Sequence, residues 1–300
     1  MNNTIEIKNL NKCYGKKQAL CDVNLTIGQG MFGLLGRNGA GKTTLMRTLA
    51  TLLPKRSGTV SVCGIPIEQD QEIRKIIGYL PQEFSMYPSM NVMEVMDYLA
   101  LLSGLKKPER RERTELLLQK VNLTEHRKKK VKALSGGMKR RLGIAQALLN
   151  NPKVLIVDEP TAGLDPEERI RFRNLLSEVA EERIVILSTH IVGDIEATCE
   201  NIAILDSGKV LYQGTVNRLL AEADGSVFTK TADRAALPSL KKELFITSMH
   251  MQGSDVSVRF LADHKVPDAH ACAPNIEDAY MYYLKKNGVE QEVNEHAVLA

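Results

Sequence analysis

The chain has 300 residues, of which 43% are hydrophobic and 25% are charged. This length and composition indicate about two folded globular domains and exclude a disordered, collagenous or coiled-coil protein. The net charge of +4 is too small to indicate a nucleic-acid-binding protein by itself. No apolar run reaches the roughly 18 to 20 residues that span a bilayer, and the first residues lack the features of a signal peptide. We therefore expect a soluble chain that does not cross a membrane alone.

The cysteines are odd in number and include no C-x-x-C pair. This pattern favours reduced thiols in a cytoplasm, with no structural disulfide and no zinc site. The five positions are Cys13, Cys21, Cys63, Cys199 and Cys272.

Strand and helix patterns alternate along the first part of the chain. Alternating or continuous apolar residues predict strands at 5–7, 60–62, 154–157 and 184–187. Apolar residues at helical spacing predict helices over 42–53, which ends at Pro54, and over 166–180. Strands that alternate with helices in this way predict an α/β fold with a mostly parallel sheet.

The strand signal fades over residues 89–149, where helical spacing predicts a helical insertion. A hairpin is predicted over 202–213, and a helix over 215–222 leads into a small polar linker. We place the domain boundary there, which gives a first domain over 1–224 and a small α+β domain over 225–300. In the second domain the patterns predict strands at 245–251 and 256–260 and a helix at 275–285.

Residues 36–43 fit the pattern G-x-x-x-x-G-K-[ST] and lie between an apolar stretch and a periodic helix. In such a loop the backbone N–H groups surround phosphate oxygens, while Lys42 reaches the β- and γ-phosphates and Thr43 holds Mg²⁺. The alternative is a glycine-rich turn whose lysine is solvated. The strand-loop-helix context favours a nucleotide site formed by Gly36, Arg37, Asn38, Gly39, Ala40, Gly41, Lys42, Thr43 and Thr44.

Two acids, Asp158 and Glu159, end the apolar run at 154–157. A strand end is where α/β folds bind ligands, so Asp158 suits the Mg²⁺ shell. Glu159 suits the task of orienting or deprotonating the attacking water. Without the phosphate loop upstream, the two acids would equally fit a solvated strand end or a helix cap.

A second candidate anion site lies at Ser135-Gly136-Gly137, ahead of a helix predicted over 138–149. A hydroxyl and two free backbone N–H groups at a helix N-terminus can bind phosphate. Taken alone, the segment also reads as an N-cap with a flexible loop. A chain with two distant phosphate sites favours a head-to-tail pair in which each copy completes the site of the other.

These motifs resemble those of the ATP-binding cassette (ABC) subunits of membrane transporters, over about residues 4–220. The resemblance rests on the phosphate loop, on Tyr79-Leu80-Pro81-Gln82, Leu134-Ser135-Gly136-Gly137, Asp158-Glu159-Pro160, Gly163-Leu164-Asp165 and Ser188-Thr189-His190, in the family's order. It implies an ABC ATPase core with an N-terminal antiparallel β subdomain and a helical insertion. It also implies an ATPase that works as a homodimer around ATP and Mg²⁺.

The resemblance also implies roles for three residues that spacing alone does not reveal. Tyr14 would stack on adenine, although on its own it reads as a half-buried strand aromatic. Gln82 would contact Mg²⁺ and the attacking water, although a glutamine after proline is usually a turn residue. His190 would bind the γ-phosphate, although a single histidine is more often structural.

The signature departs from many family members because Met138 follows the second glycine and Lys139-Arg140-Arg141 comes next. This run resembles exporter cassettes that pair with a separately encoded six-helix permease, and residues 274–280 resemble the terminal helix of such drug, antibiotic and polymer exporters. The resemblance therefore implies export of a drug, antibiotic, lipid or polymer. It places the chain in the cytoplasm, peripheral on the inner face of the membrane. No nucleic-acid partner is expected, because no aromatic interleaving or known binding motif accompanies the basic residues.

Alternatives to an exporter subunit stay open at this point. One is a soluble ABC ATPase in a process other than transport, and another is a non-hydrolysing immunity or regulatory module. Glu159 argues against the second, because losing this carboxylate is the simplest way to build an ATP sensor. The basic stretch 126–132 reads as a solvated helical face or as a surface that meets anionic headgroups.

Overall fold

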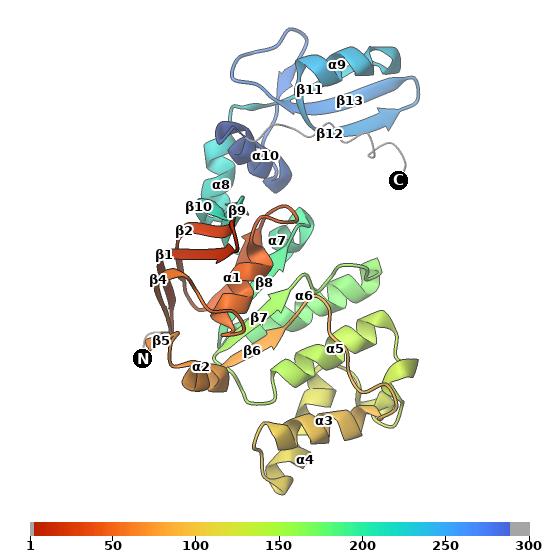
Figure 1. Cartoon of the computed structure of the whole chain (residues 1–300). Coiled ribbons are helices and arrows are strands. Elements are labelled where there is room, and N and C mark those ends of the chain that lie inside the picture. Colours follow the sequence, from red (N-terminus) through yellow and green to blue (C-terminus); the bar gives the residue numbers. More distant parts are fainter. Residues whose placement is uncertain (1–2, 289–300) are drawn as a thin grey trace. The chain divides into compact units, whose positions relative to one another are not determined.

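The computed structural model describes residues 3–288. They form two compact units that divide between Gln213 and Gly214, earlier than the boundary expected after residue 224. The reason is that helix α8 (Val216–Ala223) packs against α10 (Ile276–Lys286) and so belongs with the second unit (Figure 1). The small polar linker follows α8 and lies inside the second unit.

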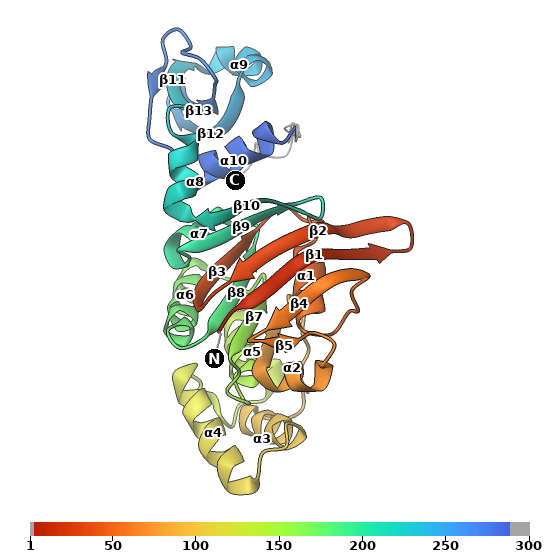
Figure 2. The ribbon, with the colours of Figure 1, turned by 90° about the vertical axis from the view of Figure 1, so that its left-hand side faces the viewer.

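The N-terminal strands form a separate antiparallel sheet in the order β2-β1-β4-β5 (Figure 2). Its strands are β1 (Ile5–Tyr14), β2 (Lys17–Ile27), β4 (Ser57–Val62) and β5 (Ile65–Pro66). Side chains at alternate positions of β1, such as Ile5 and Ile7, are buried, as the period of two in the sequence predicts. The antiparallel β subdomain is therefore present.

The central sheet has six strands in the order β10-β9-β3-β8-β7-β6. They are β3 (Gly30–Leu35), β6 (Ile77–Leu80), β7 (Val154–Asp158), β8 (Ile184–Thr189), β9 (Asn201–Asp206) and β10 (Lys209–Thr215). The pairs that join β9, β3, β8, β7 and β6 are parallel. Every residue of β7 and β8 is buried, which explains their continuous apolar runs.

Helix α1 (Lys42–Leu49) lies between the two sheets and buries Leu45, Met46 and Leu49 in the core that they share. The helix ends earlier than the predicted residue 53. Thr51 adopts a left-handed conformation with φ 58°, and the N–H groups of the next two residues turn back to the Arg47 carbonyl. Helices α6 (Pro166–Ala180) and α7 (Val192–Thr198) also pack on the central sheet, against β3 and β8.

The helical insertion consists of α3 (Val92–Leu102), α4 (Lys107–Lys120) and α5 (Gly136–Ala147), which contact one another (Figure 1). A capping box between Asn91 and Glu94 starts α3. Helix α5 begins two residues earlier than expected, because Ser135 caps it and its two glycines form the first turn. Helix α2 (Asp70–Ile76) precedes the insertion.

The second unit is a four-stranded sheet in the order β12-β13-β11-β14, with helices α8, α9 (Leu237–Glu243) and α10. Its strands are β11 (Val227–Asp233), β12 (Phe245–Gln252), β13 (Asp255–Leu261) and β14 (His270–Ala271). The sequence predicted α8, β12, β13 and α10 but missed β11, α9 and the two-residue strand β14. Strand β11 buries only its first two residues and α9 buries none, so neither element has the periodic apolar pattern on which prediction depends.

The described helices are short relative to a bilayer. The longest, α6, has 15 residues, whereas a membrane-spanning helix needs about 20. Within residues 3–288 there is no helix long and apolar enough to cross a membrane.

The five cysteines are free thiols, and Cys199 is buried. Burial raises the pKa of the Cys199 thiol to about 11. At pH 8 only about one thiol in a thousand would then be a thiolate, the form that reacts. We therefore expect iodoacetamide to label Cys13 in the native protein and Cys199 only after unfolding in urea, as read by mass spectrometry. Equal native labelling of both would contradict the buried position of Cys199.

Candidate nucleotide-binding site

The phosphate loop connects β3 to α1 and needs glycine at two of its positions for steric reasons. A Cβ at Gly36 would lie 2.3 Å from the backbone oxygen of Leu205. Gly41 precedes the first helical residue with φ 108°, and a Cβ there would lie 2.7 Å from the Ala19 oxygen. The loop is therefore held tightly against β2 and β9, and larger residues would displace it.

Lys42, the first residue of α1, is only 4% exposed. Its Nζ donates to the carbonyl oxygens of Gly36 at 2.7 Å and Arg37 at 3.1 Å. It also lies 3.3 Å from Oε1 of Glu159. The alternative of a solvated lysine is therefore wrong, because the ammonium group is buried inside the phosphate loop.

Asp158 ends β7 and is completely buried. Its Oδ1 accepts a hydrogen bond from the Ser188 hydroxyl at 2.5 Å, while Oδ2 has no hydrogen-bond partner. The alternative of a solvated strand end is therefore wrong for this residue. A buried carboxylate oxygen without a partner carries a large desolvation cost unless a cation or donor reaches it, which fits a Mg²⁺ shell.

Glu159 is the meeting point of three other predicted site residues. Oε1 faces Lys42, and Oε2 lies 3.0 Å from Nδ1 of His190 and accepts from Nε2 of Gln82 at 3.4 Å. The backbone of Glu159 is left-handed, with φ 46°, and its N–H bonds the oxygen of Ser188 at 3.1 Å. An uncommon backbone conformation in a non-glycine residue is typical of functional sites.

The strand order explains this convergence. Gln82 follows β6, Glu159 follows β7 and His190 follows β8, and these three parallel strands are neighbours in the sheet. The carboxyl ends of parallel strands meet at one edge, where α/β folds bind ligands. Strand β3, which leads into the phosphate loop, pairs with β8 and brings Lys42 to the same edge.

A cavity of about 690 Å³ opens at this edge. Its lining includes most of the predicted site, together with residues of the β1–β2 hairpin and of the β9–β10 turn. The lining residues are Tyr14, Lys17, Gln18, Ala19, Arg37, Asn38, Gly39, Gly41, Lys42, Thr43, Thr44, Gln82, Glu159, Ser207 and Gly208. A cavity of this size is within the range of small-molecule sites.

Tyr14 lies at the end of β1 and is 47% exposed. Its ring lines the cavity, and the ammonium group of Lys12 lies 5.4 Å from the ring centroid. Tyr14 is thus a roughly half-buried aromatic at a strand end, and its place in the cavity lining also allows contact with a planar ligand.

Ser135, Gly136 and Gly137 are not among the residues that line this cavity. The Ser135 hydroxyl accepts from the Met138 N–H at 3.2 Å and so caps α5. Ser135 and Gly136 are exposed, and a Cβ at Gly136 would meet no atom within 4 Å. Within one chain, the predicted second phosphate site at Ser135-Gly136-Gly137 therefore does not form part of the cavity at the phosphate loop.

Comparisons with known proteins decide the family. The family model described as "ABC transporter" matches residues 20–162. The ABC transporter ATP-binding protein YxlF of Bacillus subtilis is 32% identical over 289 residues, which cover 96% of this chain and 95% of the relative. The chain belongs to the ABC transporter family as an ATP-binding subunit.

Two further comparisons agree with this ABC assignment. The linearmycin resistance ATP-binding protein LnrL of Bacillus subtilis is 35% identical over 224 residues, covering 74% of this chain and 72% of the relative. A dimeric post-hydrolysis structure of the ATP-binding cassette MJ0796 with ADP and Pi is 28% identical, with a TM-score of 0.64, and covers 71% of this chain and 98% of that one. The predicted ABC ATPase fold and ATPase activity are confirmed.

Several residues at the site of this ABC ATPase escaped prediction. They are Lys17, Gln18 and Ala19 of β2, Ser207 and Gly208 of the β9–β10 turn, and Ser188, which holds the Asp158 carboxylate. The Ser207-Gly208 turn lies within the hairpin predicted over 202–213, whereas the hairpin after Tyr14 was not predicted. Their approach to the phosphate loop is a long-range contact, which the hydrogen bond from Gly208 N–H to Ala40 O at 2.8 Å illustrates, and local patterns do not encode it.

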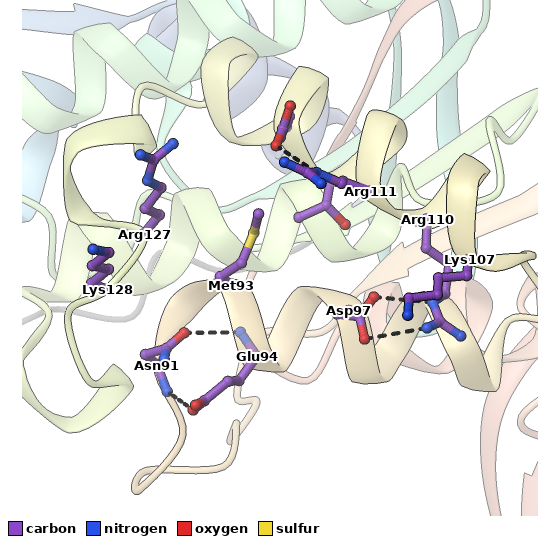
Figure 3. Close-up of a pocket in the computed structure, with 11 residues that line it drawn as sticks. Asn91, Met93, Glu94, Asp97, Lys107, Arg110, Arg111, Arg127 and Lys128 are labelled. Atoms are coloured by element: carbon purple, nitrogen blue, oxygen red, sulfur yellow. Dashed lines mark hydrogen bonds and ion pairs between the residues drawn. The ribbon is translucent and has the colours of Figure 1, made fainter.

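A second cavity, of about 560 Å³, lies between α3 and α4 of the ABC helical insertion (Figure 3). It shares no lining residue with the first. Its carboxylates already have partners: Asp97 pairs with Arg110 at 3.0 Å, Glu115 with Arg111 at 3.4 Å, and Glu94 caps α3. These three carboxylates are held by neighbouring groups of the chain, and the cavity lacks the phosphate loop that lines the first. Arg127 and Lys128 of the basic stretch line this second cavity.

Proposed function

We propose that the chain energises export through a separate transmembrane permease by hydrolysing ATP between two head-to-tail copies. The observation that carries the catalytic assignment is the convergence of Lys42, Gln82 and His190 on the Glu159 carboxylate. Phosphoryl transfer leaves the protein little covalent chemistry, so catalysis depends on placing charge and one base around the γ-phosphate. These four residues supply both.

Each residue takes one task in this proposal. Lys42 and the loop N–H groups neutralise the phosphates, and Glu159 accepts the proton of the attacking water. Gln82 and His190 hold the carboxylate of Glu159 in position, and His190 also reaches the γ-phosphate. Tyr14 stacks on the adenine ring. Glu159 is 6% exposed and its Oε1 lies 3.3 Å from the ammonium group of Lys42, so the two opposite charges interact where little solvent reaches them.

Mg²⁺ fits the residues present on chemical grounds. Its oxygen ligands would come from Asp158, whose Oδ2 has no partner, from the hydroxyl of Thr43 and from the side chain of Gln82. Once bound, the ion would neutralise charge on the β- and γ-phosphates.

The head-to-tail dimer is supported by the absence of the second phosphate site from the nucleotide cavity of a single chain. The exposed Ser135 and Gly136 at the N-terminus of α5, followed by the buried Gly137, offer donors for phosphate but do not line the cavity of their own chain. A related cassette was solved as a dimer. In the proposed pair these residues reach the ATP held by the other copy.

The permease would contact an exposed apolar surface formed by α3 and the segment that follows Gln82. Its residues are Tyr87 (46% exposed), Tyr98 (36%), Leu101 (53%) and Leu102 (64%). Tyr87 and Tyr98 pack edge to face with ring centroids 5.2 Å apart, which joins α3 to the segment that follows Gln82. Exposed apolar clusters are typical of protein interfaces, and this one lies close in sequence to a site residue.

Export, rather than another task, is supported by the Met138-Lys139-Arg140-Arg141 run and by a relative named for linearmycin resistance. With a permease as partner, the chain would be peripheral on the cytoplasmic face of the membrane. The rival of a non-hydrolysing module is disfavoured because Glu159 is present and contacts Lys42, Gln82 and His190.

The test is to tag the chain, solubilise membranes gently and identify copurifying proteins by mass spectrometry. We expect a polytopic partner with about six predicted helices. Leu101→Lys should lose that partner, because a charge enters the apolar surface, while ATP turnover of the purified chain is unchanged. Leu116→Lys, at an equally exposed leucine of α4 (53%), is the matched control and should keep the partner. A chain found with ribosomes, with nucleic acid or alone would contradict the transport proposal.

A further inference from the structure

Helix α5, which Ser135 caps, also contacts the loop that carries Gln82. Nη1 of Arg140 donates to the backbone oxygen of Gln82 at 2.8 Å. The guanidinium carbon of the same arginine lies 6.0 Å from the ring centroid of Phe84, two residues further along the loop. One side chain therefore makes a charge-assisted hydrogen bond and a cation–π contact to one loop.

Phe84 fixes the loop to α5 at a second point. A Cβ at Gly143 would lie 2.8 Å from Cζ of Phe84 and 2.6 Å from Cδ1 of Leu80. Phe84 therefore packs directly on the backbone of α5, about one turn beyond Arg140. The loop cannot move far without breaking contacts with this helix, and the helix cannot shift without moving the loop.

The other end of the loop reaches the catalytic carboxylate, since Nε2 of Gln82 donates to Oε2 of Glu159 at 3.4 Å. Burial lowers the pKa of the Arg140 guanidinium, and the charge of Glu159 acts in the opposite direction. Arg140 is therefore close enough to Glu159 for their charges to interact. It is not among the residues that line the nucleotide cavity.

We infer that Arg140 is a positioning residue for ATP hydrolysis. It fixes the position of Gln82 relative to helix α5, and Gln82 in turn positions the carboxylate of Glu159. This inference rests on the proposed roles of Gln82, Glu159 and Ser135. In the proposed dimer the N-terminus of α5 meets the nucleotide of the other copy. When that contact forms and shifts α5, Arg140 moves Gln82 of the same chain with the helix. Each copy therefore orients its own base, Glu159, at the moment when it completes the nucleotide site of the other copy.

The first test is Arg140→Met, which keeps a long apolar stem and removes the donors. We expect kcat for ATP hydrolysis to fall about tenfold, roughly the effect of losing one charge-assisted hydrogen bond, while KM for ATP stays unchanged because Arg140 does not line the cavity. Arg140→Lys, which keeps a cation and a donor, should recover part of the loss. Lys139→Met removes the neighbouring charge on the same helix and should leave kcat unchanged.

The second test is a double-mutant cycle with Gln82→Ala. If Arg140 acts through the side chain of Gln82, Arg140→Met should have little further effect on kcat in the Gln82→Ala background. Additive losses, a rise in KM without loss of kcat, or a fall of kcat in Lys139→Met equal to that in Arg140→Met would each overturn the inference. Full activity of Arg140→Met beside an active wild type would also overturn it, whereas an inactive wild type would contradict the proposed function itself.

Discussion

Glu159→Gln is expected to lower ATP turnover by about 100-fold or more, the usual contribution of a general base. ATP binding should persist or tighten, because the neutral amide no longer places a negative charge 3.3 Å from Lys42, where the phosphates would bind. With hydrolysis blocked, ATP should hold two copies together. Steady-state turnover, nucleotide titration and sedimentation velocity with and without ATP measure the three effects.

Glu167→Gln is the matched control for this prediction. Glu167 lies on α6 with a side chain that is 75% exposed, and it pairs with Arg171 of the same helix. Exposed pairs of this kind contribute about 0 to 1 kcal/mol, so turnover and sedimentation should match the wild type. Unchanged turnover in Glu159→Gln would show that another group takes the proton and that the assignment of the base is wrong.

The phosphate loop could be predicted from sequence because its chemistry is local. All its backbone N–H groups and Lys42 lie within a single segment, and the steric demand for glycine at Gly36 and Gly41 appears directly as a pattern. The structure adds the reason: the loop packs against Leu205 and Ala19, which are distant in sequence.

The convergence on Glu159 could not be derived from the residues alone. Gln82 and His190 read as a turn residue and a structural histidine until the family resemblance supplied their roles. Their proximity depends on the order β6-β7-β8 in the sheet, and strand order is set by packing between distant segments. The contact of Arg140 with Gln82 escaped prediction for the same reason.

The end of α1 and the boundary of the second unit could not be predicted from sequence for a different reason. The apolar pattern of α1 continues to Leu53, but the helix ends at Leu49. The left-handed residue Thr51 then turns the backbone back to Arg47. The domain boundary depends on which helix α8 contacts, and its partner α10 lies about 60 residues away. Local periodicity contains neither fact.

Gly136→Ala is expected to abolish most ATP turnover without harming the fold. Gly136 is the first residue of α5, its φ is not positive, and a Cβ there would meet no atom within 4 Å. Alanine is also a better helix former than glycine by up to about 1 kcal/mol, so the thermal midpoint should stay the same or rise. If the nucleotide of a second copy must approach this backbone, the added methyl group should lower turnover at least about tenfold.

The matched control is Gly193→Ala on α7, where a Cβ also meets no atom within 4 Å. This variant should keep both its thermal midpoint and its turnover. Gly137→Ala would be a poorer choice, because its Cβ would lie 2.4 Å from Oε2 of Glu168, a side chain that Arg141 holds at 3.3 Å. Any loss of activity there could come from displaced packing within the chain.

The double variant Gly136→Ala/Glu159→Gln separates binding from assembly. Each copy should still bind ATP, because its own cavity is untouched, but the ATP-dependent dimer of Glu159→Gln should no longer form in sedimentation. A normal dimer, or wild-type turnover in Gly136→Ala alone, would show that the N-terminus of α5 does not approach the other copy's nucleotide. Loss of the dimer with an unchanged thermal midpoint would place that contact between copies, because nothing within one chain opposes the methyl group.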